Sequence, residues 1–347
     1  MTPSTVSVVV PVRDGGAPFA LCLDGIASSD YELQEVIVVD DGSADGSGEL
    51  ARQRGFAVHT HAKSLGPAAA RNAGVAAASG DLVVLVDADV VVRPETIGQL
   101  VAFLEGERSR GSAVVAASAS YCADSRVTGF GSRYLNLKQR AFQQHLPPVA
   151  NTAWTAAFGI WRDAFVASGG FDDTQRHAAA DDLVLGCRVR ATGAELAFLH
   201  TTEVEHLKEL SVWGVLTFHH VHAREWTRAA PRYRALLPAK TRNSRRAVGN
   251  TLLAVSLVPQ LACAVLGPPG LRTAAAASSV GTLGVAALWN AAFLRDVARL
   301  QGTAFSAMCL PLVLAEGVAN ATGVAAGLVA NALSAPPAPS AVLPEPA

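Results

Sequence analysis

Short, unbroken runs of apolar and mostly β-branched residues recur in the first third of the chain, separated by stretches that suit helices. The apolar runs are residues 6–11, 35–39, 82–86 and 113–117, and the helix-compatible stretches are 19–28, 43–54, 67–79 and 94–107. Strands that are apolar along their whole length and alternate with helices are typical of a parallel sheet with both faces covered. The sequence therefore predicts an α/β fold, Rossmann-like, with a mostly parallel sheet and helices on both faces.

Polar clusters follow three of these strands, at residues 13–16, 40–43 and 87–89. Ligands of such sheets bind at the carboxyl ends of the strands, where these clusters would meet. Neither GxGxxG nor GxxxxGK[ST] occurs, which excludes the usual dinucleotide and P-loop phosphate cradles. Asp87 and Asp89 lie in an apolar run and need a neutralising partner. A hard divalent cation, which prefers oxygen ligands and binds phosphate oxygens, meets that need.

The last third of the chain contains two long segments without charge, between Arg246 and Arg272 and between Arg272 and Arg295. Each is long enough to cross a hydrocarbon core of about 30 Å as a helix, although a buried hairpin in a soluble domain is the alternative. A third apolar segment, about 303–333, contains Pro311 and Glu316. Either the helix breaks near Pro311 or Glu316 faces other helices, and the sequence leaves both open.

These patterns predict four regions: a catalytic domain (1–230), a basic juxtamembrane segment (231–246), a transmembrane region of about three helices (247–333) and a disordered Pro/Ala-rich tail (334–347). Basic residues before the first apolar segment place that side in the cytoplasm, and we expect no signal peptide. The five scattered cysteines indicate a reducing compartment. We therefore expect a multi-pass protein of the cell (inner or plasma) membrane with a cytoplasmic catalytic domain. A net charge of −1 gives no electrostatic reason to expect nucleic acid.

Several motifs occur in a fixed order: VSVVVPVRDGG, VIVVDDGSADGS, GPAAARNAG, GDLVVLVDADV, GGFDD and DDLVLGCRVRATG. In this order the chain resembles the family 2 glycosyltransferases with a GT-A fold, of the membrane-anchored bacterial type, over about residues 5–230. The resemblance implies an inverting, metal-dependent transferase that uses a nucleotide-sugar donor.

On the donor side, the resemblance implies that Asp41 hydrogen-bonds the base, which favours a UDP-sugar and leaves a GDP-sugar possible. Pro11 and Arg13 would line the nucleotide pocket, with the Arg13 guanidinium in the place of a stacking aromatic ring. Arg71 would lie near the nucleotide. The alternatives are that Asp40 and Asp41 serve only turn and helix-cap chemistry, and that Arg71 pairs with one of them.

On the catalytic side, the resemblance implies that Asp89 binds Mg²⁺ or Mn²⁺ directly, with Asp87 assisting and His206 as a third ligand. Asp182 matches the catalytic base. Many relatives carry a further acid two residues later, where this chain has Val184. The alternative for the acids at 181 and 182 is that they complement a helix dipole.

On the acceptor side, the resemblance places Trp154 and Thr155 near donor or acceptor, and the loop 169–172 beside the acceptor. His219, His220 and His222 lie on a basic amphipathic stretch, which indicates an interfacial role and not metal binding.

The QxxRW motif of processive synthases is absent, so we expect non-processive transfer to a hydroxyl of a lipid, a lipid-linked glycan or another membrane-proximal acceptor. A polyprenyl-phosphate glycosyltransferase is the nearer alternative, because a phosphate acceptor needs no base. A catalytically degenerate, nucleotide-binding membrane scaffold is the other.

Overall fold

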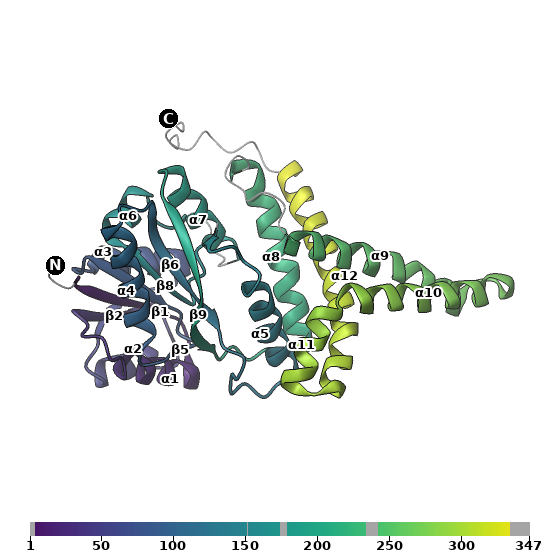
Figure 1. The fold of residues 1–347 in the computed structure, drawn as a ribbon, viewed down its shortest axis with the longest axis horizontal. Coiled ribbons are helices and arrows are strands. Elements are labelled where there is room, and N and C mark those ends of the chain that lie inside the picture. The colour runs from purple at the N-terminus through teal and green to yellow at the C-terminus, as the bar shows by residue number, and fades with distance from the viewer. Residues whose placement is uncertain (1–3, 151, 174–178, 234–241, 334–347) are drawn as a thin grey trace.

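The computed structural model describes residues 4–150, 152–173, 179–233 and 242–333. Its N-terminal part is a single sheet with helices on both faces, and its C-terminal part consists of long helices (Figure 1). Within the described residues the sheet has the strand order β3-β2-β1-β4-β8-β6-β9-β5, and β7 pairs beside β9. The strands are β1 (Val6–Val12), β2 (Glu35–Asp40), β3 (Ala57–Thr60), β4 (Leu82–Val86), β5 (Val90–Val92), β6 (Val114–Tyr121), β7 (Val149–Ala150), β8 (Ala157–Trp161) and β9 (Glu195–His206).

The α/β fold predicted from the apolar runs is confirmed. Strands β1, β2, β3 and β4 pair in parallel, and Val8 and Val10 pack into the core on one face while Val9 packs into the core on the other. The second half of the sheet is mixed, because β8 lies antiparallel between β4 and β6, and β9 is parallel to β6 but antiparallel to β5. The apolar-run pattern did not predict the direction of β8.

The helices of this part are α1 (Gly16–Ala27), α2 (Ser47–Gln53), α3 (Pro67–Ala77), α4 (Thr96–Ser109), α5 (Phe130–Gln143), α6 (Arg162–Ala167) and α7 (Asp181–Ala191). The helix expected over 43–54 begins only at Ser47. Asp40 Oδ1 accepts the backbone N–H of Ser43, and Asp45 accepts both the backbone N–H and the hydroxyl of Ser47. These side-chain bonds favour a turn over a helix, so the turn-forming alternative for Asp40 is the one the structure contains.

The C-terminal helices are α8 (Val212–Tyr233), α9 (Arg242–Leu266), α10 (Pro269–Trp289), α11 (Ala291–Gln301) and α12 (Thr303–Leu333). Segments 245–266, 269–289 and 303–333 are long and apolar enough to cross a membrane. Helices α9 and α10 form a hairpin that projects away from the sheet, whereas α12 runs alongside α8 (Figure 1). Half of the basic juxtamembrane segment (234–241) and the whole tail 334–347 lie outside the described residues.

The question raised by Pro311 and Glu316 is settled by the course of α12. The helix continues through Pro311, and the Glu316 side chain is buried against α5 and α8, where it pairs with Lys138 and His219. Glu316 therefore faces protein, as one of the two alternatives required.

Close packing of α3 on the sheet depends on Gly74. A Cβ atom at this position would lie 2.2 Å from Val9 Cγ1 and 3.1 Å from Val39 Cγ2, both on buried strands. We expect Gly74→Ala to destabilise the protein by about 1–3 kcal/mol, because the overpacked core must shift. Gly98→Ala in α4 is the matched control, since its Cβ meets nothing nearer than 3.4 Å and a helical alanine is favourable. Thermal unfolding in detergent measures both; equal melting temperatures would contradict the expectation.

Candidate active site

All the side chains predicted for the site line one cavity of about 1700 Å³. The cavity begins at the carboxyl ends of the parallel strands and continues between α5 and α8 to the C-terminal helices. The predicted residues that line it are Pro11, Arg13, Asp41, Arg71, Asp87, Asp89, Asp182 and His206. Asp41, Asp87 and Asp89 come together just after the ends of their strands, as the sequence predicted. Asp182 and His206 come from α7 and β9, more than ninety residues further along the chain.

Arg71 connects the two acidic motifs. Its Nη2 donates to Oδ1 of Asp87 and its Nη1 donates to Oδ2 of Asp181, each at 2.7 Å. The guanidinium is buried, and its carbon lies 5.3 Å from the centre of the Phe171 ring. Burial alone would lower the pKa of Arg71, but Asp87 and Asp181 outweigh it and raise that pKa. Arg71 therefore pairs with Asp87 and Asp181, and the alternative pairing with Asp40 or Asp41 is wrong.

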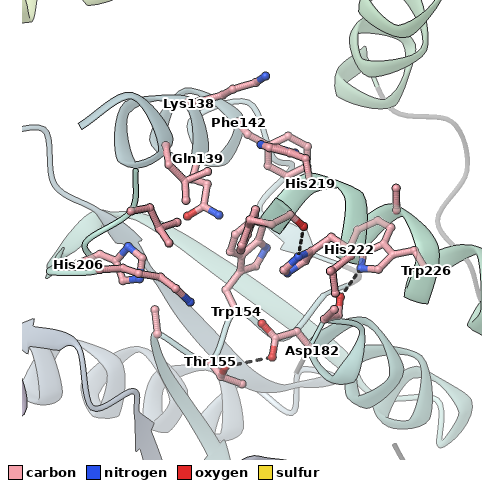
Figure 2. Close-up of a pocket in the computed structure, with 18 of the residues that line it drawn as sticks. Lys138, Gln139, Phe142, Trp154, Thr155, Asp182, His206, His219, His222 and Trp226 are labelled. Carbon is pink, nitrogen blue, oxygen red and sulfur yellow. Dashed lines mark hydrogen bonds between the residues drawn. The ribbon is translucent and has the colours of Figure 1, made fainter. Parts of the chain in front are cut away.

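Asp182 occupies the first turn of α7, next to Asp181, and its Oδ1 accepts the hydroxyl of Thr155 at 3.0 Å (Figure 2). Burial removes water from the Asp182 carboxyl and raises its pKa well above the usual range, and the charge of Asp181 raises it further. Arg71 opposes this, but its direct ion pair is with Asp181. A carboxylate with a raised pKa is a better proton acceptor, which is the chemistry that a general base requires.

Asp41 lines the cavity, but loop 61–66 surrounds its carboxylate. Oδ1 lies 2.7 Å from Nδ1 of His61 and accepts the N–H of Leu65, while Oδ2 accepts the hydroxyl of Ser64 and the N–H of Gly66. Burial alone would raise the pKa of Asp41, but these hydrogen bonds outweigh it and lower the pKa. Asp41 therefore organises the loop that closes one side of the pocket, and its contact with a base stays a prediction.

Asp89 and His206 face each other in the cavity, with 3.7 Å between Oδ2 of the aspartate and Nε2 of the histidine. Asn136 donates from Nδ2 to the backbone oxygen of His206, which orients its Oδ1 to accept the Nδ1–H of the same histidine at 2.8 Å. The Tyr121 ring stacks on the imidazole at 4.7 Å. Burial lowers the pKa of His206. A neutral ring that donates from Nδ1 to Asn136 has its Nε2 lone pair on the Asp89 side, as in a metal-ligating histidine.

A divalent cation fits this donor set only in part. Within the described residues, no group of three or more His, Cys, Asp and Glu side chains converges closely enough to hold a metal. Asp89 and His206 supply one oxygen and one nitrogen, and Asp87 adds a second carboxylate that Arg71 holds. The remaining ligands of a six-coordinate ion would come from the diphosphate of a substrate and from water, which is the usual arrangement for Mg²⁺.

Helix α5 contributes residues that sequence reasoning missed. Lys138, Gln139 and Phe142 line the cavity opposite Asp182 (Figure 2). Their helix lies between two motif-bearing segments and carries no motif of its own, so the amphipathic pattern of α5 was the available signal. Trp154 and Thr155, which the family resemblance placed near donor or acceptor, also line the cavity.

The folded chain has the GT-A architecture. It aligns with a mannosyltransferase, PcManGT from Pyrobaculum calidifontis, in a complex with GDP-Man and Mn²⁺, with a TM-score of 0.54 and 20% identity over 92% of this chain and 88% of that one. Residues 7–167 match the sequence model of the family described as Glycosyl transferase family 2. The chain thus carries a family 2 glycosyltransferase domain.

Curated relatives support the same assignment over shorter segments. Glycosyltransferase GlyG of Streptococcus pneumoniae is 36% identical over 27% of this chain and 33% of its own length. Undecaprenyl-phosphate 4-deoxy-4-formamido-L-arabinose transferase of Aeromonas hydrophila is 38% identical over 28% of this chain and 32% of its own. The match therefore spans about one third of the length of each of these two relatives.

Removal of the Arg71 guanidinium should expose how strongly the two acidic motifs depend on it. We expect Arg71→Met to destabilise the protein by about 3–5 kcal/mol, because Asp181 is left buried without its partner. In Arg71→Met/Asp181→Asn the unpaired charge is gone, so the double variant should be more stable than Arg71→Met alone. Melting temperatures of Arg71→Met, Asp181→Asn, the double variant and the wild type complete the cycle. Additive effects of the two substitutions would show that the ion pair contributes no coupling free energy to stability.

Proposed function

We propose that this protein transfers a sugar from a nucleoside diphosphate sugar, with a UDP-sugar favoured, to a hydroxyl of an acceptor at the membrane surface, with inversion and without processivity. The observation that carries the proposal is the shared cavity in which Arg71 joins the Asp87 motif to the motif that contains Asp182. One continuous cavity thus connects the groups suited to binding a diphosphate with Asp182, the carboxylate suited to accepting a proton.

On the donor side, Pro11, Arg13 and Asp41 surround the place of the nucleoside, at the ends of β1 and β2. The Arg13 guanidinium is exposed and hydrogen-bonds Ser64 at 3.0 Å, so it can turn onto a base. Asp89 and His206, with Asp87, would hold Mg²⁺ or Mn²⁺. A bound divalent cation neutralises the charge that develops on the leaving diphosphate.

On the acceptor side, Asp182 is the base. Its carboxylate takes the proton of the acceptor hydroxyl while the oxygen attacks the anomeric carbon from the face opposite the diphosphate, so the configuration inverts. The Thr155 hydroxyl fixes the orientation of the carboxylate. Arg71 holds Asp181 and thereby keeps the two neighbouring acids in different roles.

Transfer to a polyprenyl phosphate is the second candidate, and one observation favours it: the similarity to the Aeromonas enzyme that is named an undecaprenyl-phosphate transferase. A phosphate acceptor is already an anion, so Asp182 would be dispensable. A catalytically degenerate scaffold would bind nucleotide and show neither transfer nor donor hydrolysis.

We infer that the α9–α10 hairpin crosses the membrane and that α12 lies along its cytoplasmic surface. Gly323 and Gly327 of α12 pack against the backbone oxygens of His220 and Arg224 on α8, and the Asn331 amide donates to the oxygen of Thr227. A helix packed in parallel along so polar a partner cannot cross the hydrocarbon core beside it. The hairpin projects away from this pair, and its large apolar side chains are exposed (Figure 1).

Nucleotide binding should reveal the donor class. We expect UDP with Mn²⁺ to raise the melting temperature, since a ligand that binds only the folded state stabilises it, and we expect Asp89→Asn to lose the Mn²⁺-dependent part of the shift. The response of the wild type to GDP under the same conditions is the comparison. A shift with GDP alone would replace UDP by GDP as the donor nucleotide, and no shift with either would overturn the donor assignment.

Proton transfer should depend on Asp182. We expect Asp182→Asn to slow transfer to a hydroxyl acceptor by roughly 10²–10⁴-fold, the usual contribution of a general base, while the shift with UDP and Mn²⁺ is retained. Radiolabelled sugar transfer measures the rate, and Asp173→Asn, a nearby acid outside the cavity lining, is the control. Wild-type rates in Asp182→Asn with a phosphate acceptor would establish the polyprenyl-phosphate alternative.

Cysteine accessibility should distinguish two membrane spans from three. In intact cells a membrane-impermeant maleimide should label Gly270→Cys at the tip of the hairpin and should not label Leu333→Cys at the exposed end of α12. The parent protein provides the background, because four of its five cysteines are buried and only Cys263 is partly exposed. Labelling of Leu333→Cys from outside would show that α12 crosses.

A further inference from the structure

We propose that the part of the cavity between α5, α8 and α12 binds an amphipathic acceptor, with a hydroxyl-bearing, uncharged head group beside Asp182 and an apolar tail that enters from the bilayer between α9 and α12. This inference rests on the proposed function, because it names the acceptor of the same site. It assigns the C-terminal helices a role in binding substrate in addition to anchoring the chain.

Among the buried polar atoms of the cavity wall that lack a hydrogen-bond partner within the described residues, two belong to uncharged side chains that form no ion pair. One is the indole N–H of Trp154, which is a donor, and the other is Oε1 of Gln139, which is an acceptor. Buried polar atoms without a partner are rare and call for one from outside the protein. A hydroxyl both donates and accepts, so the hydroxyls of a sugar-like head group satisfy both atoms.

The position of these two atoms suits the reaction. Trp154 adjoins Thr155, which donates to Asp182, and Gln139 lines the opposite side of the cavity, so the two atoms flank the space in front of the base (Figure 2). The Trp154 ring is held between Phe142 and Phe198, with centroids 5.8 Å and 6.5 Å away. A rigid indole next to the base can orient a head group so that one hydroxyl reaches Asp182.

The charges deeper in the cavity are paired with one another. Glu316 of α12 contacts Lys138 of α5, and its Oε1 lies 2.7 Å from Nε2 of His219 on α8. Asn250 and Asn290 exchange hydrogen bonds at 3.2 Å and 2.9 Å. Walls of paired charges and amides suit a neutral, polar group better than a free anion.

Two cations, Lys208 and Arg246, also line the cavity. A phosphate-bearing acceptor would use these two cations, so the test includes a phosphate-bearing competitor.

The far end of the cavity opens toward the lipid. Leu252 of α9 and Val324 of α12 line the cavity and are nevertheless 65% and 42% exposed, so they form its rim. Phe293 and Val313 continue the apolar wall inward from this rim. One side of the rim is α9, whose exposed large side chains are apolar and which is long enough to cross a bilayer. An acyl or prenyl tail can therefore reach the cavity without leaving an apolar environment.

The test uses the full chain in phosphatidylcholine nanodiscs and a photoreactive dodecyl glucoside as the probe. We expect the probe to label peptides from α5, α8 and α12 that line the cavity. Excess dodecyl glucoside should compete, whereas methyl glucoside and dodecyl phosphate should not. Labelling confined to the outer face of the α9–α10 hairpin would overturn the proposal. Stronger competition by dodecyl phosphate would overturn the assignment of an uncharged head group and assign the site to a phosphate.

Matched variants locate the binding site. We expect Val324→Trp to reduce cavity labelling by about tenfold, which corresponds to a loss of about 1.4 kcal/mol of binding free energy, and Val329→Trp to leave it unchanged. Both replace a valine of α12, but Val329 is 58% exposed and lies outside the cavity lining. Equal effects of the two variants would overturn the proposed route of the tail.

Gln139→Met tests the head group in the same way. We expect it to weaken competition by dodecyl glucoside by about fivefold, the effect of one lost hydrogen bond, and to leave competition by dodecanol unchanged. An equal loss with both competitors would show that Gln139 only shapes the cavity.

The thermal shift with UDP and Mn²⁺ separates this inference from the proposed function, because it reports the donor site alone. A shift without cavity labelling means that the acceptor inference fails while the donor site stands. Labelling without any nucleotide response means that the proposed function fails and that the cavity binds an amphiphile for another purpose.

Discussion

The fork of Arg71 between Asp87 and Asp181 is the interaction on which the rest of the site depends. Three negative charges from two distant motifs would repel one another in a water-poor wall if no cation lay between them. A planar guanidinium donates to two carboxylates at once, which a lysine ammonium does with much less geometric control. Because Arg71 belongs to α3, and Gly74 of the same helix packs on Val9, the position of the fork is set by the packing of that helix on the sheet.

A small number of specific contacts joins the N-terminal α/β part to the C-terminal helices. Gly323 and Gly327 bring α12 against α8, and Glu316 connects that pair to Lys138 on α5. The cavity lies between these elements, so helices that are long and apolar enough to cross a membrane also form a wall of the site. Such an arrangement suits an enzyme whose acceptor remains in the bilayer while its donor comes from water.

Sequence reasoning identified most of the candidate site because that information is local. A run such as LVVLV followed by Asp87 and Asp89 indicates a strand and its polar end without reference to any other part of the chain. The unpartnered atoms of Gln139 and Trp154 could not be found in this way, because a missing partner is a property of the surroundings. The alternative that paired Arg71 with Asp40 or Asp41 was wrong for the same reason: Asp181 lies 110 residues away and reaches Arg71 only through the fold.

The sequence by itself determined the α/β class, the parallel half of the sheet, the acidic clusters at the strand ends and the apolar length of the C-terminal helices, because each follows from residue type and spacing along a short segment. Only the tertiary structure decided that β8 is antiparallel, that Asp41 is enclosed by loop 61–66, that Glu316 faces protein and that α12 lies along α8. These features depend on contacts between distant segments, whose free energies are settled by packing and charge pairing in three dimensions and not by local pattern.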